Sequence, residues 1–315
     1  MTRRWGVCVL GAAGFVASCG DGRVIVLGLG ATADGGIGAA GDAPSGAPDG
    51  SFGSFGPPQL IPELEASGAD DFKPTLTADM REIFFLSSRS GGPGEGDVWH
   101  ATRARPSDPW SPPSCVLEVS SPSHETSPAV SDDGLTLWVA SDRPGGQGGY
   151  DIWVSTRPVS GATWSAPTVV PELSSPGDEI PRPPGLGGAA MPLAYRSSSS
   201  SQYQTYTSTR QSVDGPWQAP SKLTSIDSAN IDTDGFFGAD GTLFYFSSDR
   251  ISQGDQDLFV GSRSSTTAAF TSFSPLLGLN VAGHDDRDPW VSADGRTIYF
   301  ASDRSGNLKL YVATR

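Results

Sequence analysis

The feature that most constrains the fold of this chain is an internal repeat of about 54 residues. Arginines recur at steps of 54, 53, 54 and 54 residues, at Arg89, Arg143, Arg196, Arg250 and Arg304. A second series recurs at steps of 54, 53, 53 and 52 residues, at Arg103, Arg157, Arg210, Arg263 and Arg315. Aromatic residues keep the same spacing at Trp110, Trp164, Trp217 and Phe270. Three series in phase indicate five copies of one structural unit.

Each unit predicts four short strands. An apolar run such as Leu137–Ala140 follows an Asp-Gly turn, a third strand opens on an aspartate, and the fourth opens on the repeated aromatic. With 40 Gly and 26 Pro the chain has little room for helices. The strand after the turn ends in a Ser-Asp-Arg triplet, which predicts a structural role for Asp142, Arg143, Asp249, Arg250, Asp303 and Arg304. Four strands in about fifty residues are typical of a β-propeller blade.

The ends of the chain predict the number of blades and how the ring closes. Five units, at about 57–116, 117–170, 171–223, 224–276 and 277–315, fill the region, and the last unit stops at its third strand. Phe55–Leu64 repeats the aromatic, both prolines, the Glu and the Leu of Trp164–Leu173, so it can supply the missing fourth strand. We therefore predict an all-β, five-bladed propeller of four-stranded antiparallel blades, closed by an N-terminal strand that completes the last blade.

The repeat also resembles a known type. The pattern Ser-x-Asp-Gly-x-x-apolar-x-Phe-x-Ser-Asp-Arg, followed by Asp-Ile-Trp-Val, resembles the WD40-like propeller repeat of bacterial envelope proteins, including the TolB propeller. The resemblance implies a repeat type and does not name a ligand. The third unit departs from it, because it lacks Asp-Gly and Ser-Asp-Arg and carries Tyr195, Tyr203 and Tyr206. We take these three tyrosines as the candidate ligand surface.

The N-terminus predicts export. Two arginines precede an apolar run from Trp5 to Val16 that is too short for a permanent membrane span and suits a signal peptide. Val16-Ala-Ser-Cys19 resembles the bacterial lipoprotein box, which implies removal of residues 1–18, lipidation of Cys19 and a membrane anchor. An ordinary signal peptide cleaved nearby is the alternative. Because Gly20 follows the cysteine, we expect anchoring at the outer membrane. Residues 19–56 predict a flexible tether rich in Gly, Ala, Asp and Pro.

Charge and metal-ligand content exclude several classes of function. The formal net charge is −14, and removal of Arg3 and Arg4 with the signal peptide takes it to −16, which disfavours binding to nucleic acid. Three cysteines cannot build a disulfide framework, and the three histidines form no zinc-type pair. We expect a monomer with no metal site and no cofactor, apart from the cation considered next.

One acidic residue recurs in every unit near the start of the predicted innermost strand. The five are Asp71, Glu125, Glu179, Asp232 and Asp286. One hypothesis is a ring of carboxylates at a channel mouth, where like charges raise one another's pKa or hold a cation. The alternative is structural: each acid caps its own turn or pairs with an arginine of a neighbouring blade. Repetition in every blade favours the structural role, because active sites break symmetry.

Two functions follow from these patterns. The first is a lipid-anchored envelope propeller that binds or scaffolds an envelope protein, a peptide or a glycan, with no catalytic residue. The alternative is a five-bladed enzyme like a glycoside hydrolase that uses axial carboxylates. Catalysis needs carboxylates in unlike environments, whereas the repeat offers similar ones, so the binding module is the preferred interpretation.

Overall fold

The computed structural model describes residues 16–19, 23–26 and 54–315, except 229 and 252–253. The chain divides into two units, residues 1–46 and 47–315. In the first unit, β1 (Val16–Cys19) pairs antiparallel with β2 (Arg23–Val26), and Cys19 lies opposite Arg23. The rest of the predicted signal peptide and most of the predicted tether lie outside the described residues.

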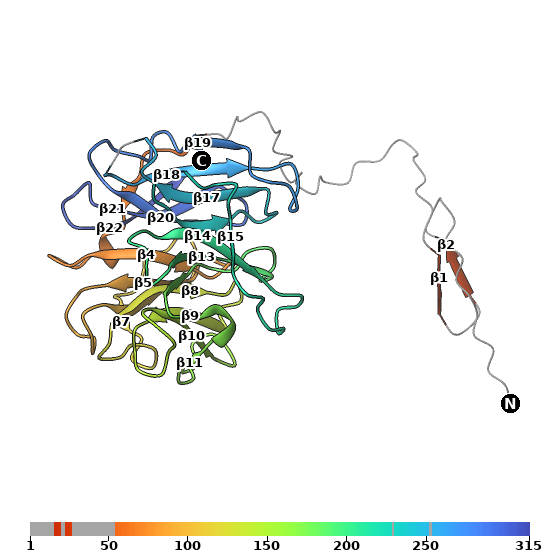
Figure 1. Ribbon diagram of the computed structural model, residues 1–315, viewed down its shortest axis with the longest axis horizontal. Coiled ribbons are helices and arrows are strands. Elements are labelled where there is room, and N and C mark those ends of the chain that lie inside the picture. Colours follow the sequence, from red (N-terminus) through yellow and green to blue (C-terminus); the bar gives the residue numbers. More distant parts are fainter. Residues whose placement is uncertain (1–15, 20–22, 27–53, 229, 252–253) are drawn as a thin grey trace. The chain divides into compact units, whose positions relative to one another are not determined.

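The second unit is a five-bladed propeller, as predicted (Figure 1). The innermost strands are β4 (Asp71–Leu76), β8 (Glu125–Val130), β12 (Asp178–Pro181), β16 (Asp232–Phe237) and β20 (Asp286–Val291). The second strands are β5 (Glu82–Ser87), β9 (Thr136–Ser141), β13 (Ala190–Arg196), β17 (Leu243–Ser248) and β21 (Thr297–Ser302). The third strands are β6 (Asp97–Thr102), β10 (Asp151–Thr156), β14 (Gln204–Thr209), β18 (Asp257–Ser262) and β22 (Lys309–Thr314). The outer strands are β7 (Ser114–Cys115), β11 (Thr168–Val169), β15 (Ser221–Lys222), β19 (Ser272–Pro275) and β3 (Gln59–Leu60).

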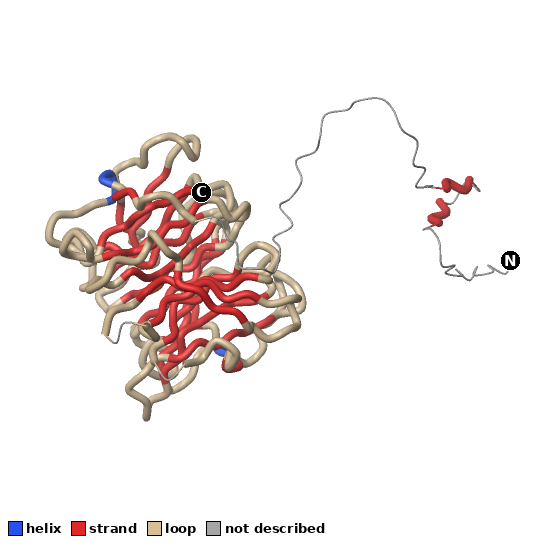
Figure 2. The backbone as a smooth tube through the Cα atoms, turned by 90° about the horizontal axis from the view of Figure 1, so that it is seen from above, coloured by secondary structure: helices blue, strands red, loops and turns tan. Residues whose placement is uncertain are grey.

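Each blade is a four-stranded antiparallel sheet, and the blades are numbered one to five in the order of their innermost strands. The predicted Asp-Gly turns join the first two strands of blades two, four and five, where Gly134, Gly241 and Gly295 take φ of 71°, 69° and 69°. This left-handed conformation favours glycine. Within the described residues the helical turns are two short 3₁₀ segments, η1 (Pro62–Leu64) and η2 (Pro171–Leu173), and strands dominate the propeller (Figure 2). No helix in this part of the chain has the length and apolar character needed to cross a membrane.

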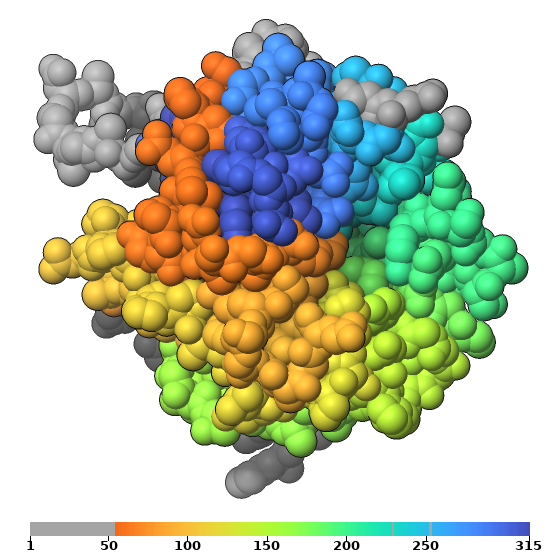
Figure 3. Space-filling model, turned by 90° about the vertical axis from the view of Figure 1, so that its left-hand side faces the viewer, coloured from red at the N-terminus to blue at the C-terminus, as the bar shows by residue number. Residues whose placement is uncertain are grey.

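The ring closes as predicted, because β3 is the fourth strand of blade five. Leu60 lies opposite Tyr311 and Gln59 opposite Val312 in an antiparallel pair. The space-filling view shows the two ends of this unit against each other, orange beside dark blue (Figure 3). The second arginine series and the aromatic series also meet. The distance from guanidinium to ring is 4.0 Å for Arg103–Trp110, 4.4 Å for Arg157–Trp164, 4.3 Å for Arg210–Trp217, 4.5 Å for Arg263–Phe270 and 4.7 Å for Arg315–Phe55.

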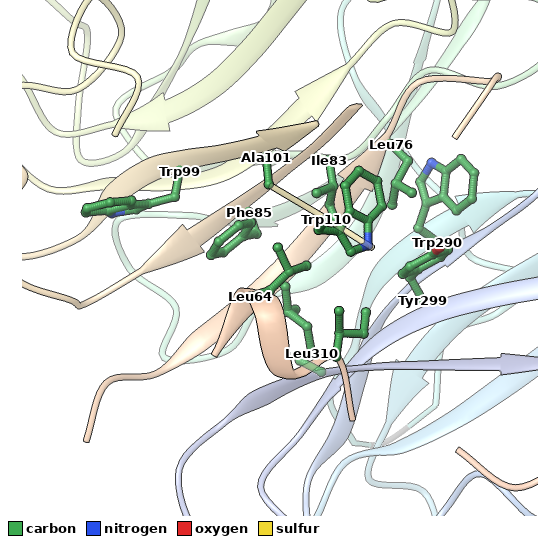
Figure 4. Close-up of a cluster of buried hydrophobic side chains, with 12 residues drawn as sticks. Leu64, Leu76, Ile83, Phe85, Trp99, Ala101, Trp110, Trp290, Tyr299 and Leu310 are labelled. Carbon is green, nitrogen blue, oxygen red and sulfur yellow. The ribbon is translucent and has the colours of Figure 1, made fainter. Parts of the chain in front are cut away.

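The hydrophobic core lies between neighbouring blades. Where blade five meets blade one, Leu76 and Ile83 of blade one pack in one cluster with Trp290 and Leu310 of blade five (Figure 4). Leu64 of η1 joins this cluster and is fully buried. The short segment after β3 therefore helps to fasten the two ends of the ring, in addition to the strand pairing.

Four of the innermost strands contain a bulge that the sequence pattern did not predict. The register with the second strand shifts in β4, β8, β16 and β20. At each shift a non-glycine residue takes a positive φ: Lys73 (54°), Ser127 (50°), Asp234 (57°) and Asp288 (60°). Such a conformation is uncommon for non-glycine residues, and bulges next to functional sites re-aim side chains.

Candidate functional site

Four of the five blades hold a largely buried arginine two residues after the end of the second strand, and blade two shows its surroundings. Arg143 Nη2 donates to Oε1 of Glu125 at 2.8 Å and to the carbonyl of Val119 at 2.6 Å. Its Nε donates to Oγ of Ser141 at 2.9 Å, and its guanidinium lies 5.3 Å from the ring of Trp153. We call this set of acid, serine, carbonyl and aromatic the arginine socket. The same contacts recur around Arg89, Arg250 and Arg304.

The predicted acid series supplies the carboxylate of every socket. Asp71, Glu125, Asp232 and Asp286 are at most 1% exposed, and each accepts from the arginine eighteen residues later in its own blade. Each also accepts from the backbone N–H of the turn before it. The partners of these four carboxylates are therefore those of the structural alternative, except that the arginine comes from the same blade and not from a neighbouring one.

The aspartate of each Ser-Asp-Arg triplet does not bond to the arginine beside it. It accepts instead from the backbone N–H of the residue that precedes the acid. The pairs are Asp142 with His124 (2.9 Å), Asp249 with Ile231 (2.8 Å) and Asp303 with Asp285 (3.0 Å). Acid, serine, aspartate and arginine thus tie the second strand to the innermost one at the same end of the blade.

Blade three keeps the acid and loses the arginine. Glu179 lies opposite Tyr195 in the β12–β13 pair, as Glu125 lies opposite Ser141. This register places Ser197, not Arg196, at the position of Arg143. Arg196 lies one residue earlier and pairs with Asp178. The sequence series grouped Arg196 with the other four arginines; the structure corrects this, and the displacement explains why Arg196 follows its acid by seventeen residues whereas the other four arginines follow theirs by eighteen.

A pocket of about 260 Å³ occupies the place of the socket in blade three. Glu179, Tyr195 and Tyr206 line it, together with Leu173, Ser174, Ser175 and Pro220. We call it the blade-three pocket. Leu173 corresponds to Val119, because each lies six residues before the acid of its blade. Tyr206 corresponds to Trp153, since it lies opposite Leu193 as Trp153 lies opposite Val139.

Glu179 is 1% exposed and accepts from the Ser175 backbone N–H at 3.0 Å and from the Ser175 hydroxyl. Burial raises the pKa of Glu179 to about 7; the Ser175 hydrogen bonds oppose this shift, and the charges of Asp151 and Asp178 add to it. The other members of the acid series are not among the causes. Near neutral pH both the neutral and the charged form of this carboxyl are therefore populated, and a cation beside it would stabilise the charged form.

Two of the three candidate tyrosines line the pocket. The rings of Tyr195 and Tyr206 lie 4.8 Å apart between centroids, tilted by 60°. Tyr203 lies elsewhere: its hydroxyl donates to Asp178 at 3.2 Å and its ring lies 4.7 Å from the guanidinium of Arg196. Burial, followed by the charge of Asp178, raises the pKa of Tyr203. The structure thus brings Tyr195 and Tyr206 together with Glu179 and leaves Tyr203 in the neighbouring ion pair.

The bulges bring a second group of charges together at the propeller axis, which the sequence analysis missed. Lys73 Nζ lies 2.6 Å from Oδ1 of Asp234 and 3.1 Å from Oδ1 of Asp288. Arg182 Nη2 donates to the carbonyl of Pro289 at 2.9 Å. Blades one and four, and blades three and five, are not neighbours in a five-membered ring, so these contacts cross the axis. We call Lys73, Arg182, Asp234, Arg287 and Asp288 the axial cluster.

The axial cluster is nearly closed to solvent and only partly paired, because Nε and Nη1 of Arg182 and Nε of Arg287 are buried without a hydrogen-bond partner. The side chains of Asp234 and Asp288 are 6% and 0% exposed, and Arg182 is fully buried. Although burial opposes it, the charges of Lys73, Arg182 and Arg287 hold the pKa of Asp234 well below its usual range. Each bulge residue lies two positions after an acid of the repeated series, which is a signal that sequence analysis could have used. No group of three or more His, Cys, Asp or Glu side chains in residues 54–315, as described, is placed to hold a metal ion.

Comparison with known proteins supports the fold alone. No family model matches the chain, and no curated protein matches its sequence. Among solved structures, it is similar to the endo-arabinase from Bacteroides thetaiotaomicron VPI-5482, at 13% identity over 82% of this chain and 97% of the other, with a TM-score of 0.55. It is similar to the alpha-L-arabinofuranosidase PaAbf62A from Podospora anserina, at 13% identity over 83% and 96%, with a TM-score of 0.54.

TolB from Acinetobacter baumannii also matches, at 15% identity over 78% of this chain, with a TM-score of 0.47. The chain spans 55% of the length of that protein. The protein is thus an all-β, five-bladed propeller with both TolB and carbohydrate-active enzymes among its structural neighbours. At these identities the likeness shows the fold alone, so the function must be argued from the site.

Proposed function

We propose that this chain is a non-catalytic propeller, lipid-anchored in the bacterial envelope, that binds a protein, peptide or glycan through the blade-three pocket. One observation carries the proposal. In four blades the repeated acid is paired with an arginine, whereas Glu179 lies instead in a pocket beside Tyr195 and Tyr206. A buried carboxyl next to aromatic faces in a concave site is the usual composition of a ligand pocket.

A glycoside hydrolase is the second candidate, favoured by two carboxylates at the axis of a fold similar to that of two arabinan-related enzymes. Hydrolysis of a glycosidic bond needs one carboxyl that stays protonated to act as general acid. Asp234 and Asp288 instead share the ammonium of Lys73, and the pKa of Asp234 is lowered. The pairing of these two aspartates with Lys73 therefore supports a structural role for them better than catalysis.

A binding screen separates the two candidates. The full chain in detergent is presented to a glycan array and to solubilised envelope fractions, with arabinan and arabinoxylan oligosaccharides assayed for hydrolysis in parallel. We expect a captured ligand, retained by the control Tyr203→Phe and lost in the double variant Glu179→Gln, Tyr206→Ala. Hydrolysis that is abolished by Asp288→Asn would replace the proposal with the enzyme.

The anchor is a separate part of the proposal. Cys19, which ends β1, is the residue we propose to be lipidated, in keeping with a site at the outer membrane. Metabolic labelling with an alkyne fatty acid in a bacterial host should label the wild type and leave Cys19→Ala unlabelled. Label on both proteins, or on neither, would contradict lipidation of Cys19. Cleavage of an ordinary signal peptide would then be the remaining explanation for export. We further propose a monomer that needs no cofactor, for which light scattering of the detergent-solubilised chain should give one protomer per particle.

A further inference from the structure

Four of the five blades show which group fills an arginine socket. In blades one, two, four and five the occupant is a guanidinium that meets a carboxylate, a backbone carbonyl and an aromatic ring. Blade three retains three of these partners at the corresponding positions: Glu179, Leu173 and Tyr206. The fourth partner, the serine that accepts from Nε, is replaced by Tyr195, which adds a second aromatic face.

We propose that the blade-three pocket binds an arginine side chain from a partner polypeptide. The inference rests on the proposed function, because it names the ligand of the same pocket. A guanidinium donates several hydrogen bonds in one plane and stacks on aromatic faces, so carboxylate, carbonyl and tyrosine rings suit it together. The other four blades show that this repeat satisfies a guanidinium in that way.

Size and charge also favour this occupant. The pocket of about 260 Å³ is smaller than the roughly 300–1,000 Å³ of sites for whole small molecules, so it suits one side chain better than an oligosaccharide. The chain has a formal net charge of −14, which favours approach of a cationic segment. A guanidinium would also pair with Glu179, the one acid of the repeated series whose own blade supplies it no arginine.

The binding test uses the full chain in detergent, labelled with fluorotyrosine, with the ¹⁹F resonances assigned from Tyr→Phe variants. The probes are N-acetyl-arginine amide, the uncharged isostere N-acetyl-citrulline amide, and arabinotriose. We expect saturable shifts of Tyr195 and Tyr206 with the arginine probe and at least tenfold weaker binding of citrulline. No response to the arginine probe, equal binding of citrulline, or shifts with arabinotriose alone would overturn the inference.

Two variants link the response to the socket. Glu179→Gln should weaken the arginine probe at least tenfold, while the matched control Tyr203→Phe should bind it as the wild type does. The double variant Tyr195→Ser, Ser197→Arg restores the repeat and should fill the socket from within, so it should lose the probe and melt at a higher temperature than the wild type. A double variant with a raised melting temperature and undiminished binding would contradict the inference.

Failure of the inference can be told apart from failure of the proposed function. If Glu179→Gln, Tyr206→Ala loses an envelope ligand that the arginine probe does not displace, the pocket binds another chemistry and only the inference fails. If the envelope ligand binds this double variant as it binds the wild type, the blade-three pocket is not the site, and both fail.

Discussion

Arg196 pairs with Asp178 and not with Glu179, the next residue along β12. The corresponding arginines of the other blades pair with the acid itself and fill the socket around it. Because the arginine of blade three is displaced by one residue, the socket that is filled in the other four blades is an open pocket in blade three. Glu179 stays buried without a guanidinium, and burial holds its pKa near 7.

The filled sockets should be essential to stability. Arg143→Ala leaves Glu125 buried with an unpaired charge, so we expect the free energy of unfolding to fall by about 3–5 kcal/mol. Arg196 has a side chain that is 37% exposed, so Arg196→Ala should cost only about 0–1 kcal/mol. Chemical denaturation of both variants at neutral pH tests the contrast, and equal losses would contradict the structural role of the socket.

The raised pKa of Glu179 predicts that the free energy of unfolding falls as the pH rises. Its pKa of about 7 in the folded chain lies above the ordinary 4.5, so between these values the folded state holds a proton that the unfolded state has released. The free energy of unfolding should decrease by about 3 kcal/mol from pH 4.5 to pH 8 through this one group.

The variant Glu179→Gln removes this titration, so denaturation curves of the two proteins isolate it. Relative to the wild type, the variant should gain stability as the pH rises from 4.5 to 8. A constant difference between the two proteins over that range would show that Glu179 titrates at its ordinary pKa.

The lowered pKa of Glu82, which lies at a contact between blades one and two, predicts that the free energy of unfolding falls as the pH is lowered. Although burial opposes it, hydrogen bonds from His100, Ser160 and Arg157 lower the pKa of Glu82 to about 2. Its contribution to stability is therefore complete above pH 4.5 and lost as the pH falls through 2. We expect Glu82→Gln to cost about 3 kcal/mol at pH 7 and almost nothing at pH 2. A cost that persists at pH 2, measured by urea denaturation, would assign the effect to packing.

The closure of the ring can be tested at Phe55, which packs against blade five and lies under the guanidinium of Arg315. Phe55→Ala removes a buried aromatic ring and should cost about 3–5 kcal/mol. It should also increase exchange of the backbone amides in β22, which loses its outer partner when β3 detaches. Destabilisation without faster exchange in β22 would show that β3 does not depend on Phe55.

The repeat was sufficient to predict the blades because each arginine and aromatic series recurs at a nearly constant step. The pairing of β3 with β22 followed from the match between Phe55–Leu64 and Trp164–Leu173. The positions of Lys73 and Asp288, two residues after an acid of the series, could be read from the repeat. Their meeting at the axis could not, because strand alternation does not reveal the bulges that turn the two residues toward one another. The loss of the arginine in blade three was visible only as a spacing of seventeen residues, and not eighteen, between Glu179 and Arg196, and its meaning required the register of Glu179 with Tyr195.

The most direct test of the account is the pKa of Glu179 itself, measured by NMR of ¹³C-labelled carboxyl groups in the full chain, with Glu179→Gln to assign the resonance. We expect a pKa of about 7 without ligand. Saturating N-acetyl-arginine amide should lower this pKa, whereas N-acetyl-citrulline amide should not, because only the guanidinium favours the charged carboxylate. A pKa near 4.5 without ligand, or one that the arginine probe does not change, would contradict the assignment of this pocket as an arginine socket that lacks its own arginine.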